Sequence, residues 1–280
     1  MIDARLIDRI GRWIEQRTEA MGQDSPPPVL GIAGSQGSGK STLAKAVAER
    51  FGGASLSLDD VYLTKAERAA MAARVHPLFA TRGPPGTHDL GLLNRLLDRL
   101  QGAGPDDLTP LPRFDKLADD RAAEADWPVV TGRPRVIVLE GWCLGATPQA
   151  EGDLVAPINA LEAQKDVGAE WRRAVNAALG QPYARLRARL DALIFLKAPG
   201  FDVVLDWRCE QEAGLMGQDA VSPERRAALT VFIQHYERLS RHMMTGGVEA
   251  DLIVALGWDR GFAALKAGLA PEPHLCVIGP

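Results

Sequence analysis

The sequence has few cysteines and no excess of positive charge. Its three cysteines, Cys143, Cys209 and Cys276, lie far apart, so they fit neither the ligand spacing of a zinc site nor a disulfide framework. The formal net charge is −4, which excludes an overall basic field for nucleic acid or for an anionic membrane. We therefore expect a protein of the reducing cytoplasm that binds no nucleic acid.

Long apolar runs, repeats and low-complexity tracts are also absent. No stretch approaches the roughly 20 apolar residues that cross a bilayer, and residues 1–16 are charged and amphipathic, without the apolar core of a signal peptide. The hydrophobic content of 46% over 280 residues is nevertheless enough to bury a full core. We expect no membrane partner and one domain over residues 1–280, as a monomer or a homodimer, with an N-terminal helix and linker at 1–28 and a helical insertion at 144–190.

A glycine-rich turn stands out in residues 29–43, VLGIAGSQGSGKSTL, between a short apolar strand and the start of a helix. The turn fits the phosphate-binding P-loop pattern G-x-x-x-x-G-K-[ST], with Gly34, Gly39, Lys40 and Ser41 in the fixed places. Glycines let backbone N–H groups point at phosphate oxygens, the lysine supplies a mobile cation, and the serine hydroxyl reaches a nucleotide-bound Mg²⁺. A glycine-rich turn with a surface lysine is the plain alternative, but the flanking strand and helix favour the P-loop. The predicted ATP-binding residues are Gly34, Ser35, Gln36, Gly37, Ser38, Gly39, Lys40, Ser41 and Thr42.

Acidic residues end two further strand candidates. Asp59 and Asp60 follow residues 54–58, and Glu140 follows residues 136–139. Open α/β sheets bind their ligands at the carboxyl ends of the strands, so we expect these acids beside the P-loop, although helix caps and turns are alternative roles. Either aspartate could orient Mg²⁺ or accept a proton from an acceptor hydroxyl, and Glu140 has the position of an acid that holds Mg²⁺ through water. The predicted metal site is made of Ser41, Glu140 and Asp59.

Polar segments further along the chain could line an acceptor site. The loop at 82–89 is rich in glycine and proline and carries Arg82, His88 and Asp89, which suit an anionic or hydroxylated substrate; a turn with an aspartate helix cap is the alternative. Residues 111–116 place charges around an aromatic ring, either as a substrate wall or as a solvated run. Arginines flank the segment 213–223, which has the composition of a mobile lid, and of these we expect Arg208 to reach the transferring phosphoryl group.

Strand and helix candidates alternate along the chain. The first of five strand candidates begins at residue 29, and the other four lie at 54–58, 136–139, 191–196 and 251–256. This alternation favours a three-layer α/β P-loop NTPase fold, with a central, mainly parallel sheet, helices on both faces, and helical insertions that include a lid. Helices are expected at 2–17, 42–51, 64–74, 90–100, 155–165, 170–179, 184–190, 201–212 and 224–244, with a short final helix after Arg260.

Several of these segments occur together in one known family. GSQGSGKST, LDDVYLT, RGPPGTHD, PRFDK, VIVLEGW and VLDWRCEQE follow one another between residues 29 and 259, and together they resemble the D-glycerate 3-kinase family. The layout is more distantly similar to the uridine kinase, pantothenate kinase and phosphoribulokinase group. The P-loop is shared by many NTPases, whereas the set of DDVYLT, RGxxGTHD and EGW is much more specific. The resemblance implies ATP- and Mg²⁺-dependent phosphorylation of a small hydroxylated molecule, with D-glycerate as the leading candidate.

The same resemblance implies roles for individual residues. Asp59 matches the acid that acts as base after the second strand, and Lys40 and Arg208 would complete the catalytic set. Val61 and Phe114 depart from the family, which more often has an aromatic residue and a tyrosine at these positions of the substrate wall. The implied substrate-binding residues are Asp60, Tyr62, Arg82, His88, Arg113 and Asp115.

Two other functions remain open at this point. The acceptor could be a nucleoside, a pantothenate-like molecule or a sugar phosphate, although a nucleoside site would be expected to use more aromatic stacking. The chain could also be an ATP-dependent switch that acts on a protein partner. A switch needs a residue that positions water, but it does not need an acid pair aimed at an acceptor hydroxyl.

Overall fold

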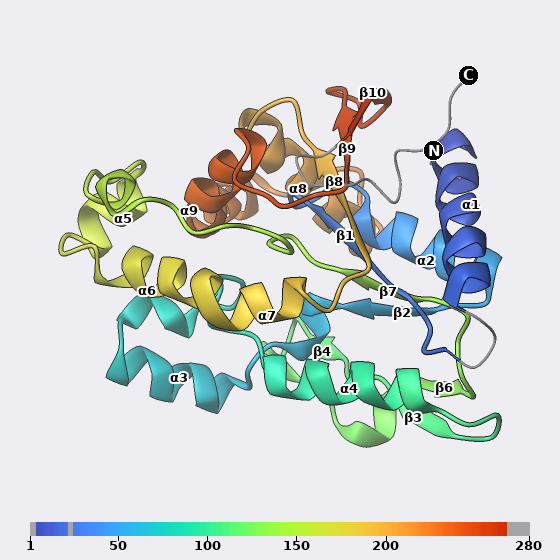
Figure 1. Cartoon of the computed structure of the whole chain (residues 1–280). Helices are drawn as coiled ribbons and strands as arrows, with labels where there is room; N and C mark the ends of the chain where they lie inside the picture. Colours follow the sequence, from blue (N-terminus) through green and yellow to red (C-terminus); the bar gives the residue numbers. More distant parts are fainter. Residues whose placement is uncertain (1–3, 22–24, 268–280) are drawn as a thin grey trace.

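The structure, a computed structural model, describes residues 4–21 and 25–267 and centres on a six-stranded sheet (Figure 1). The strand order is β10-β9-β8-β1-β7-β2, and all neighbours are parallel except β10, which runs antiparallel to β9. Because β1 lies between β7 and β8, the turn that follows it emerges at the middle of the carboxyl edge. The strands are β1 (Val29–Gly34), β2 (Ala54–Ser57), β7 (Ile137–Glu140), β8 (Ala192–Lys197), β9 (Leu252–Leu256) and β10 (Phe262–Ala267).

Helices surround this sheet. In the view of Figure 1, α4, α6 and α7 lie in the lower half of the molecule, and α8 and α9 lie in the upper half, beside β8 and β9. Two helix starts follow directly from the sequence: Thr64 and Glu67 form a capping box before α3, and the Asp89 side chain caps α4. The helices are α1 (Ala4–Met21), α2 (Lys40–Phe51), α3 (Lys65–Arg74), α4 (Leu90–Gly102), α5 (Ala160–Lys165), α6 (Glu170–Ala178), α7 (Ala184–Arg187), α8 (Asp202–Leu215) and α9 (Pro223–Met244).

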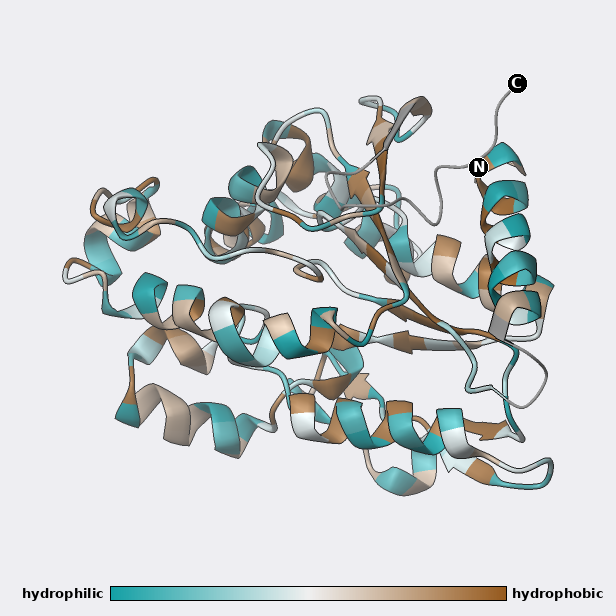
Figure 2. Cartoon of the chain, viewed as in Figure 1, coloured by the Kyte–Doolittle hydropathy of each residue, from teal (hydrophilic) through white to brown (hydrophobic). Residues whose placement is uncertain are grey.

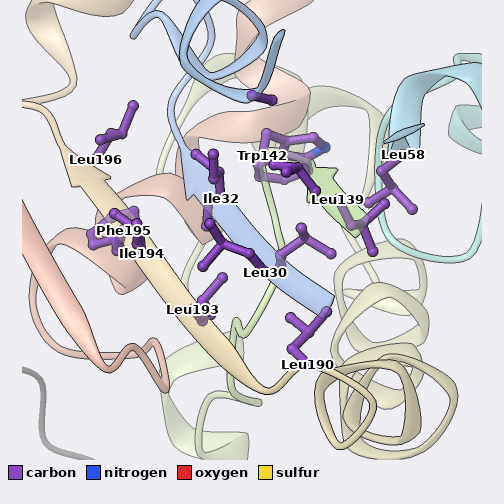
Figure 3. Packing of buried hydrophobic residues seen from close by; sticks show 14 of the residues in the cluster. Leu30, Ile32, Leu58, Leu139, Trp142, Leu190, Leu193, Ile194, Phe195 and Leu196 are labelled. Carbon is purple, nitrogen blue, oxygen red and sulfur yellow. The ribbon is translucent and has the colours of Figure 1, made fainter. Parts of the chain in front are cut away.

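The core lies along the central strands. All six residues of β1 are buried, as expected for a parallel strand that is covered on both faces. Figure 3 shows Leu30 and Ile32 of β1 close to Leu193 of β8 and Leu139 of β7. Figure 2 shows the same division across the molecule, with hydrophobic residues along the central strands and many hydrophilic residues on the outer helices. None of the described helices is both long and apolar enough to cross a membrane.

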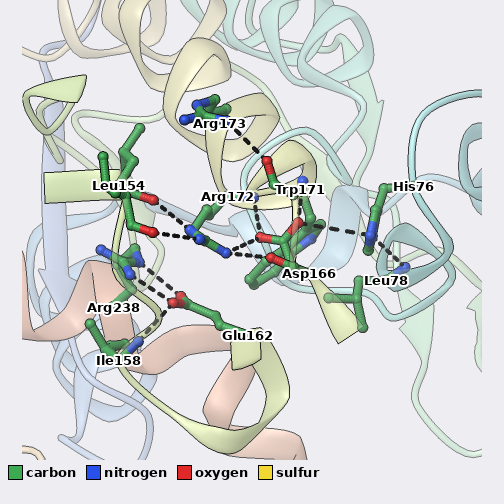
Figure 4. Close-up of polar contacts among 12 residues, drawn as sticks. His76, Leu78, Leu154, Ile158, Glu162, Asp166, Trp171, Arg172, Arg173 and Arg238 are labelled. Atoms are coloured by element: carbon green, nitrogen blue, oxygen red, sulfur yellow. Dashed lines mark hydrogen bonds and ion pairs between the residues drawn. The ribbon is translucent and has the colours of Figure 1, made fainter. Parts of the chain in front are cut away.

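Buried ion pairs hold the segment around α5 and α6 together and attach it to α9 (Figure 4). Asp166 and Arg172 pair at 2.9 Å with both side chains almost fully buried, and Glu162 pairs with Arg238 of α9 at 2.6 Å. The Arg172 guanidinium also donates to the carbonyl of Leu154 at 2.6 Å. Buried charges are tolerated when they are paired and hydrogen-bonded, so this network fixes the segment that the sequence described least well.

The structure confirms the mainly parallel α/β sheet and corrects several element boundaries. The short final helix is wrong: Arg260 adopts a left-handed φ of 63°, the chain reverses, and the next residues form β10. Pairing with the exposed edge of β9 outweighs the helix preference of an alanine-rich segment. Only Ala160–Lys165 of the helix expected at 155–165 is α-helical, and α8 continues to Leu215, into the expected lid segment.

Two small antiparallel strand pairs were not expected from the sequence. β3 (Leu108–Pro110) pairs with β6 (Val129–Thr131), and β4 (Phe114–Asp115) pairs with β5 (Asp120–Arg121). Strands of two or three residues leave no usable hydrophobic period in a sequence. Parts of some expectations, such as Ile2 of the first helix, residues 23–24 of the linker and Cys276, lie outside the described residues.

Candidate active site

The P-loop lies between β1 and α2 and is closely packed. Lys40 is the first residue of α2, and its Nζ donates to the carbonyl of Ser35 at 2.9 Å. Gly37 has a φ of 72°, and a Cβ there would lie 2.6 Å from the Cβ of Trp207 on α8. Only glycine satisfies both conditions, so the turn keeps its backbone N–H groups free of side-chain bulk.

Arg260 supports the same turn from the β9–β10 connection. Its Nε donates to the carbonyl of Gly37 at 2.8 Å, and its guanidinium lies over the Trp207 ring, 5.2 Å from the centroid. It also pairs with Glu210 at 2.6 Å. No local sequence pattern links Arg260 to Gly37, because the two residues lie 223 positions apart.

Glu140 connects the P-loop helix to the ends of two neighbouring strands. One oxygen of its carboxylate accepts hydrogen bonds from the hydroxyls of Ser41, at 2.9 Å, and Ser57, at 2.7 Å. Burial raises the pKa of Glu140, although the nearby Lys40 ammonium opposes this shift. Burial likewise lowers the pKa of Lys40, and the charge of Glu140 opposes that shift. The acid and the cation therefore stabilise each other's charged forms.

Asp59 faces the P-loop from the end of β2. Its Oδ1 accepts a hydrogen bond from the Tyr62 hydroxyl at 2.7 Å, and its Oδ2 pairs with the Lys116 ammonium at 3.2 Å. Burial alone would raise the pKa of Asp59, but the Lys116 charge and the Tyr62 hydrogen bond prevail and lower it to about 2. Asp59 is therefore ionised at neutral pH.

These groups share one polar cavity of about 250 Å³. It brings together the predicted catalytic residues Asp59, Lys40 and Arg208 and the predicted metal site. Arg208 donates to Glu212 at 3.1 Å, and its buried Nε has no hydrogen-bond partner. The cavity is lined by Gln36, Gly37, Lys40, Ser41, Ser57, Asp59, Asp60, Tyr62, Arg82, Lys116, Glu140, Trp142, Arg208, Gln211, Phe232 and Tyr236.

Three of the predicted substrate-binding residues lie outside the lining of this cavity. Arg113 pairs with Asp60 at 2.7 Å, and Asp115 accepts hydrogen bonds from backbone N–H groups two and three residues further on. His88 is buried behind Tyr62, with ring centroids 4.7 Å apart, and its Nδ1 hydrogen-bonds with the Tyr183 hydroxyl. Burial lowers the pKa of His88 to about 4, so the ring is neutral at physiological pH.

Arg82 and Asp60 do reach the cavity, and each is held by an ion pair, Asp60 by the one with Arg113. Arg82 pairs with Asp119, and its guanidinium lies over the Phe114 ring. The turn after Arg82 needs glycine, because Gly83 has a φ of 119° and a Cβ there would overlap the Tyr236 hydroxyl. That hydroxyl donates to the Arg82 carbonyl at 3.1 Å, which ties the 82–89 loop to α9.

Several lining residues were not predicted. Lys116 and Trp142 belong to the PRFDK and EGW segments, and Ser57 lies two residues before Asp59, so a local signal existed for these three. Gln211, Phe232 and Tyr236 lie on α8 and α9, where helical spacing does not distinguish a cavity-facing residue from a packing one.

The fold and the cavity define a P-loop kinase. A P-loop after the central strand, an acid at the end of the neighbouring strand and a further carboxylate in the same cavity are the parts that phosphoryl transfer requires. No family model matches the chain. The chain is 31% identical over 246 residues to a protein of Schizosaccharomyces pombe called uncharacterized kinase mug58, and the match covers 82% of this chain and 85% of that protein.

Two further comparisons agree. The chain is 34% identical over 218 residues to the chloroplastic D-glycerate 3-kinase of Arabidopsis thaliana, covering 72% of this chain and 45% of the plant protein. The solved structure of a D-glycerate 3-kinase from Cryptococcus neoformans has the same fold, with a TM-score of 0.75 and 22% identity over 94% of this chain and 98% of that one. The chain belongs to the D-glycerate 3-kinase family of P-loop kinases. It is an ATP-dependent phosphotransferase with a hydroxyl group as acceptor.

Proposed function

We propose that the chain transfers the γ-phosphoryl group of MgATP to a hydroxyl of D-glycerate. The observation that carries the reaction type is the Asp59 carboxylate, which shares a cavity with Lys40 and Glu140. The similarity to the plant D-glycerate 3-kinase supports the choice of acceptor. Two cations in the cavity wall near Asp59, Arg82 and Lys116, also suit an acceptor that carries a carboxylate.

We place the nucleotide across the P-loop. The phosphates would meet the N-terminus of α2 and the Lys40 ammonium, where backbone N–H groups and the helix dipole favour anions. On the other side of the loop lies a less polar cavity of about 230 Å³, which suits an adenine base. Its lining comprises Leu6, Ser38, Gly39, Thr42, Leu43, Leu196, Val254, Leu256, Arg260 and Phe262.

The oxygen groups beside Lys40 fit Mg²⁺. Ser41, Asp59 and Glu140 offer a hydroxyl and two carboxylates, the hard oxygen donors that Mg²⁺ prefers, and nucleotide phosphates and water commonly supply its remaining ligands. Within residues 4–21 and 25–267, no cluster of three or more His, Cys, Asp or Glu residues could hold a metal ion. When bound, Mg²⁺ would neutralise charge on the β- and γ-phosphates.

The chain's own residues then position and polarise the reactants. Asp59 accepts the proton of the acceptor hydroxyl, and the oxygen of that hydroxyl bonds to the γ-phosphorus of ATP. The bond from this phosphorus to the bridging β,γ-oxygen breaks, which releases ADP. Lys40 and Arg208 stabilise the negative charge on the phosphoryl oxygens. Because Asp59 is ionised at neutral pH, it can accept a hydrogen bond from the acceptor hydroxyl and orient it, and in phosphoryl transfer such positioning contributes much of the rate.

Release of ADP with and without D-glycerate tests this function, followed by phosphorus NMR of the product. Acceptor-dependent ADP and a new phosphomonoester signal would support it and would identify the phosphorylated carbon. Stimulation by another hydroxylated metabolite, but not by D-glycerate, would keep the kinase and reject the acceptor. Stimulation by no small molecule would favour a switch that acts on a protein partner.

A further inference from the structure

Lys116 occupies an unusual place in the cavity, because it is paired with the proposed base. Its Nζ lies 3.2 Å from Asp59 Oδ2, while Tyr62 donates to Oδ1. Both oxygens of Asp59 therefore already have a donor. Since Lys116 and Tyr62 both line the cavity, an acceptor hydroxyl that is to give its proton to Asp59 competes with one of them for the carboxylate.

The two donors differ in how easily they can leave. Tyr62 is 2% exposed and stacks on His88, so its hydroxyl is fixed by packing. The Lys116 side chain is 43% exposed, so water can solvate its ammonium when it leaves Asp59, whereas the buried Tyr62 hydroxyl has no such compensation. The Lys116 ammonium is therefore the donor that yields.

The backbone beneath Lys116 is held in place on both sides. Asp115 Oδ1 accepts from the N–H groups of Leu117 and Ala118, which shapes the turn between β4 and β5. Asp119, at the far end of that turn, pairs with Arg68 at 2.7 Å and also with Arg82. Since the turn is anchored, only the flexible four-carbon stem of Lys116 needs to move for its ammonium to change partner.

The other cations of the cavity have different partners. Lys40 belongs to the P-loop itself. Arg208 directly follows Trp207, which packs on Gly37 of the P-loop. Both cations therefore lie on the phosphate side of the cavity. Arg82 is already paired with Asp119. Lys116 is thus placed to respond to a negative charge that the acceptor brings.

We propose that Lys116 selects acidic acceptors by exchanging partners. The carboxylate of a small hydroxy acid draws the Lys116 ammonium away from Asp59, which frees Oδ2 to receive the acceptor hydroxyl. A neutral polyol leaves the Lys116–Asp59 pair intact, so its hydroxyl must compete with the Lys116 ammonium for the base. The inference rests on the proposed function and deepens it, because it links recognition of the carboxylate to exposure of the base.

The test compares D-glycerate with glycerol, its neutral counterpart, in Lys116→Met, Lys116→Arg and wild type. In Lys116→Met, kcat/KM for D-glycerate should fall by about 10- to 100-fold, the usual loss when a charge-assisted contact is removed. The kcat/KM for glycerol should stay unchanged or rise, because the Lys116 ammonium no longer competes for Asp59. The KM for ATP should stay unchanged. Lys116→Arg should recover most of the preference for D-glycerate.

Lys45→Met is the matched control, since Lys45 is 75% exposed on α2 and pairs only at 3.8 Å with Glu49 among the interactions described. This variant should leave kcat/KM for D-glycerate, kcat/KM for glycerol and the melting temperature unchanged. Equal losses for D-glycerate and glycerol with a raised KM for ATP would overturn the inference, because Lys116 would then serve the phosphates. An unchanged preference for D-glycerate in Lys116→Met would overturn it as well.

Wild-type activity separates this inference from the proposed function. If wild type ignores D-glycerate but phosphorylates another hydroxy acid, only the acceptor identity fails, and Lys116→Met must still lose that activity selectively. If wild type prefers a neutral acceptor, or none, both the acceptor and the role of Lys116 are refuted.

Discussion

The Ser41 hydroxyl donates a hydrogen bond to the Glu140 carboxylate at 2.9 Å, so the first turn of α2 is joined to the end of β7. Ser57 of β2 donates to the same oxygen. Three segments that are far apart in the sequence therefore converge on one acid beside the P-loop, and the position expected to hold Mg²⁺ is already ordered by two hydroxyls.

Replacement of Glu140 by Gln tests this position. The amide keeps the shape but removes the charge that attracts Mg²⁺, so kcat/KM should fall by about 100-fold and the Mg²⁺ concentration for half-maximal activity should rise. ADP release over a Mg²⁺ titration measures both. Ser57→Ala removes one hydrogen bond and keeps the charge, so it should cost less than about 10-fold. Full activity of Glu140→Gln at low Mg²⁺ would contradict the metal assignment.

Asp59→Asn should separate binding from transfer. The amide cannot take the acceptor proton, so kcat should fall by about 100- to 10,000-fold, while the dissociation constant for ATP changes little. Single-turnover phosphoryl transfer and equilibrium nucleotide binding are the two measurements. Lys40→Ala is the contrasting variant, because loss of the P-loop ammonium should impair the nucleotide-dependent activity. Unchanged turnover in Asp59→Asn would rule out Asp59 as the base.

Arg208→Met should act mainly on the chemical step. The residue lines the cavity and its Nε is buried without a partner, which leaves a donor for the transferring phosphoryl group. We expect kcat to fall by about 1,000-fold with a smaller change in the KM for ATP. Arg226 pairs with Asp206 and is half-exposed, so Arg226→Met is a matched control that should remain active. Similar losses in the two variants would point to a structural effect.

His88 predicts a dependence of stability on pH. Its pKa is lowered from 6.5 to about 4 by burial, so between these values the unfolded chain binds a proton that the folded chain does not. The free energy of unfolding should therefore decrease as the pH falls through this window, and His88 alone should contribute about 2 kcal/mol of this loss between about pH 6.5 and about pH 5.

Urea unfolding of wild type and His88→Gln at about pH 7 and about pH 5 measures this effect. Glutamine does not titrate, so the stability advantage of wild type should shrink at the lower pH. An advantage that stays constant would mean that the ring is protonated in the folded protein.

Arg260 predicts an effect on nucleotide affinity from outside the P-loop. Arg260→Ala removes the hydrogen bond to the Gly37 carbonyl and the contact with the Trp207 ring, so the P-loop loses a support. The KM for ATP should rise by about 5- to 10-fold, with a smaller change in kcat. Tryptophan fluorescence should change as well, because Trp207 donates from its indole nitrogen to the Trp258 carbonyl beside Arg260. An unchanged KM would reject the supporting role.

Some parts of the site were predictable because their signals are local. The P-loop needs glycines and a lysine at fixed spacing, and the capping box of Thr64 and Glu67 is read from four consecutive residues. His88 and Asp115 carry residue types that suit a substrate site, and their role there stays a prediction. Neither lines the cavity: the His88 ring is stacked behind Tyr62, and the Asp115 side chain accepts hydrogen bonds within its own turn.

The parallel α/β sheet, the phosphate-binding turn and the acids at the strand ends could be predicted from the sequence, because periodicity and short motifs act over a few residues. The cations that face Asp59 and the residue that supports the P-loop became evident only from the folded chain. Lys116 lies 57 positions from Asp59, and Arg260 lies 223 positions from Gly37. Such pairings depend on strand order and on the packing of a hairpin and a helix against the sheet, which no local pattern specifies.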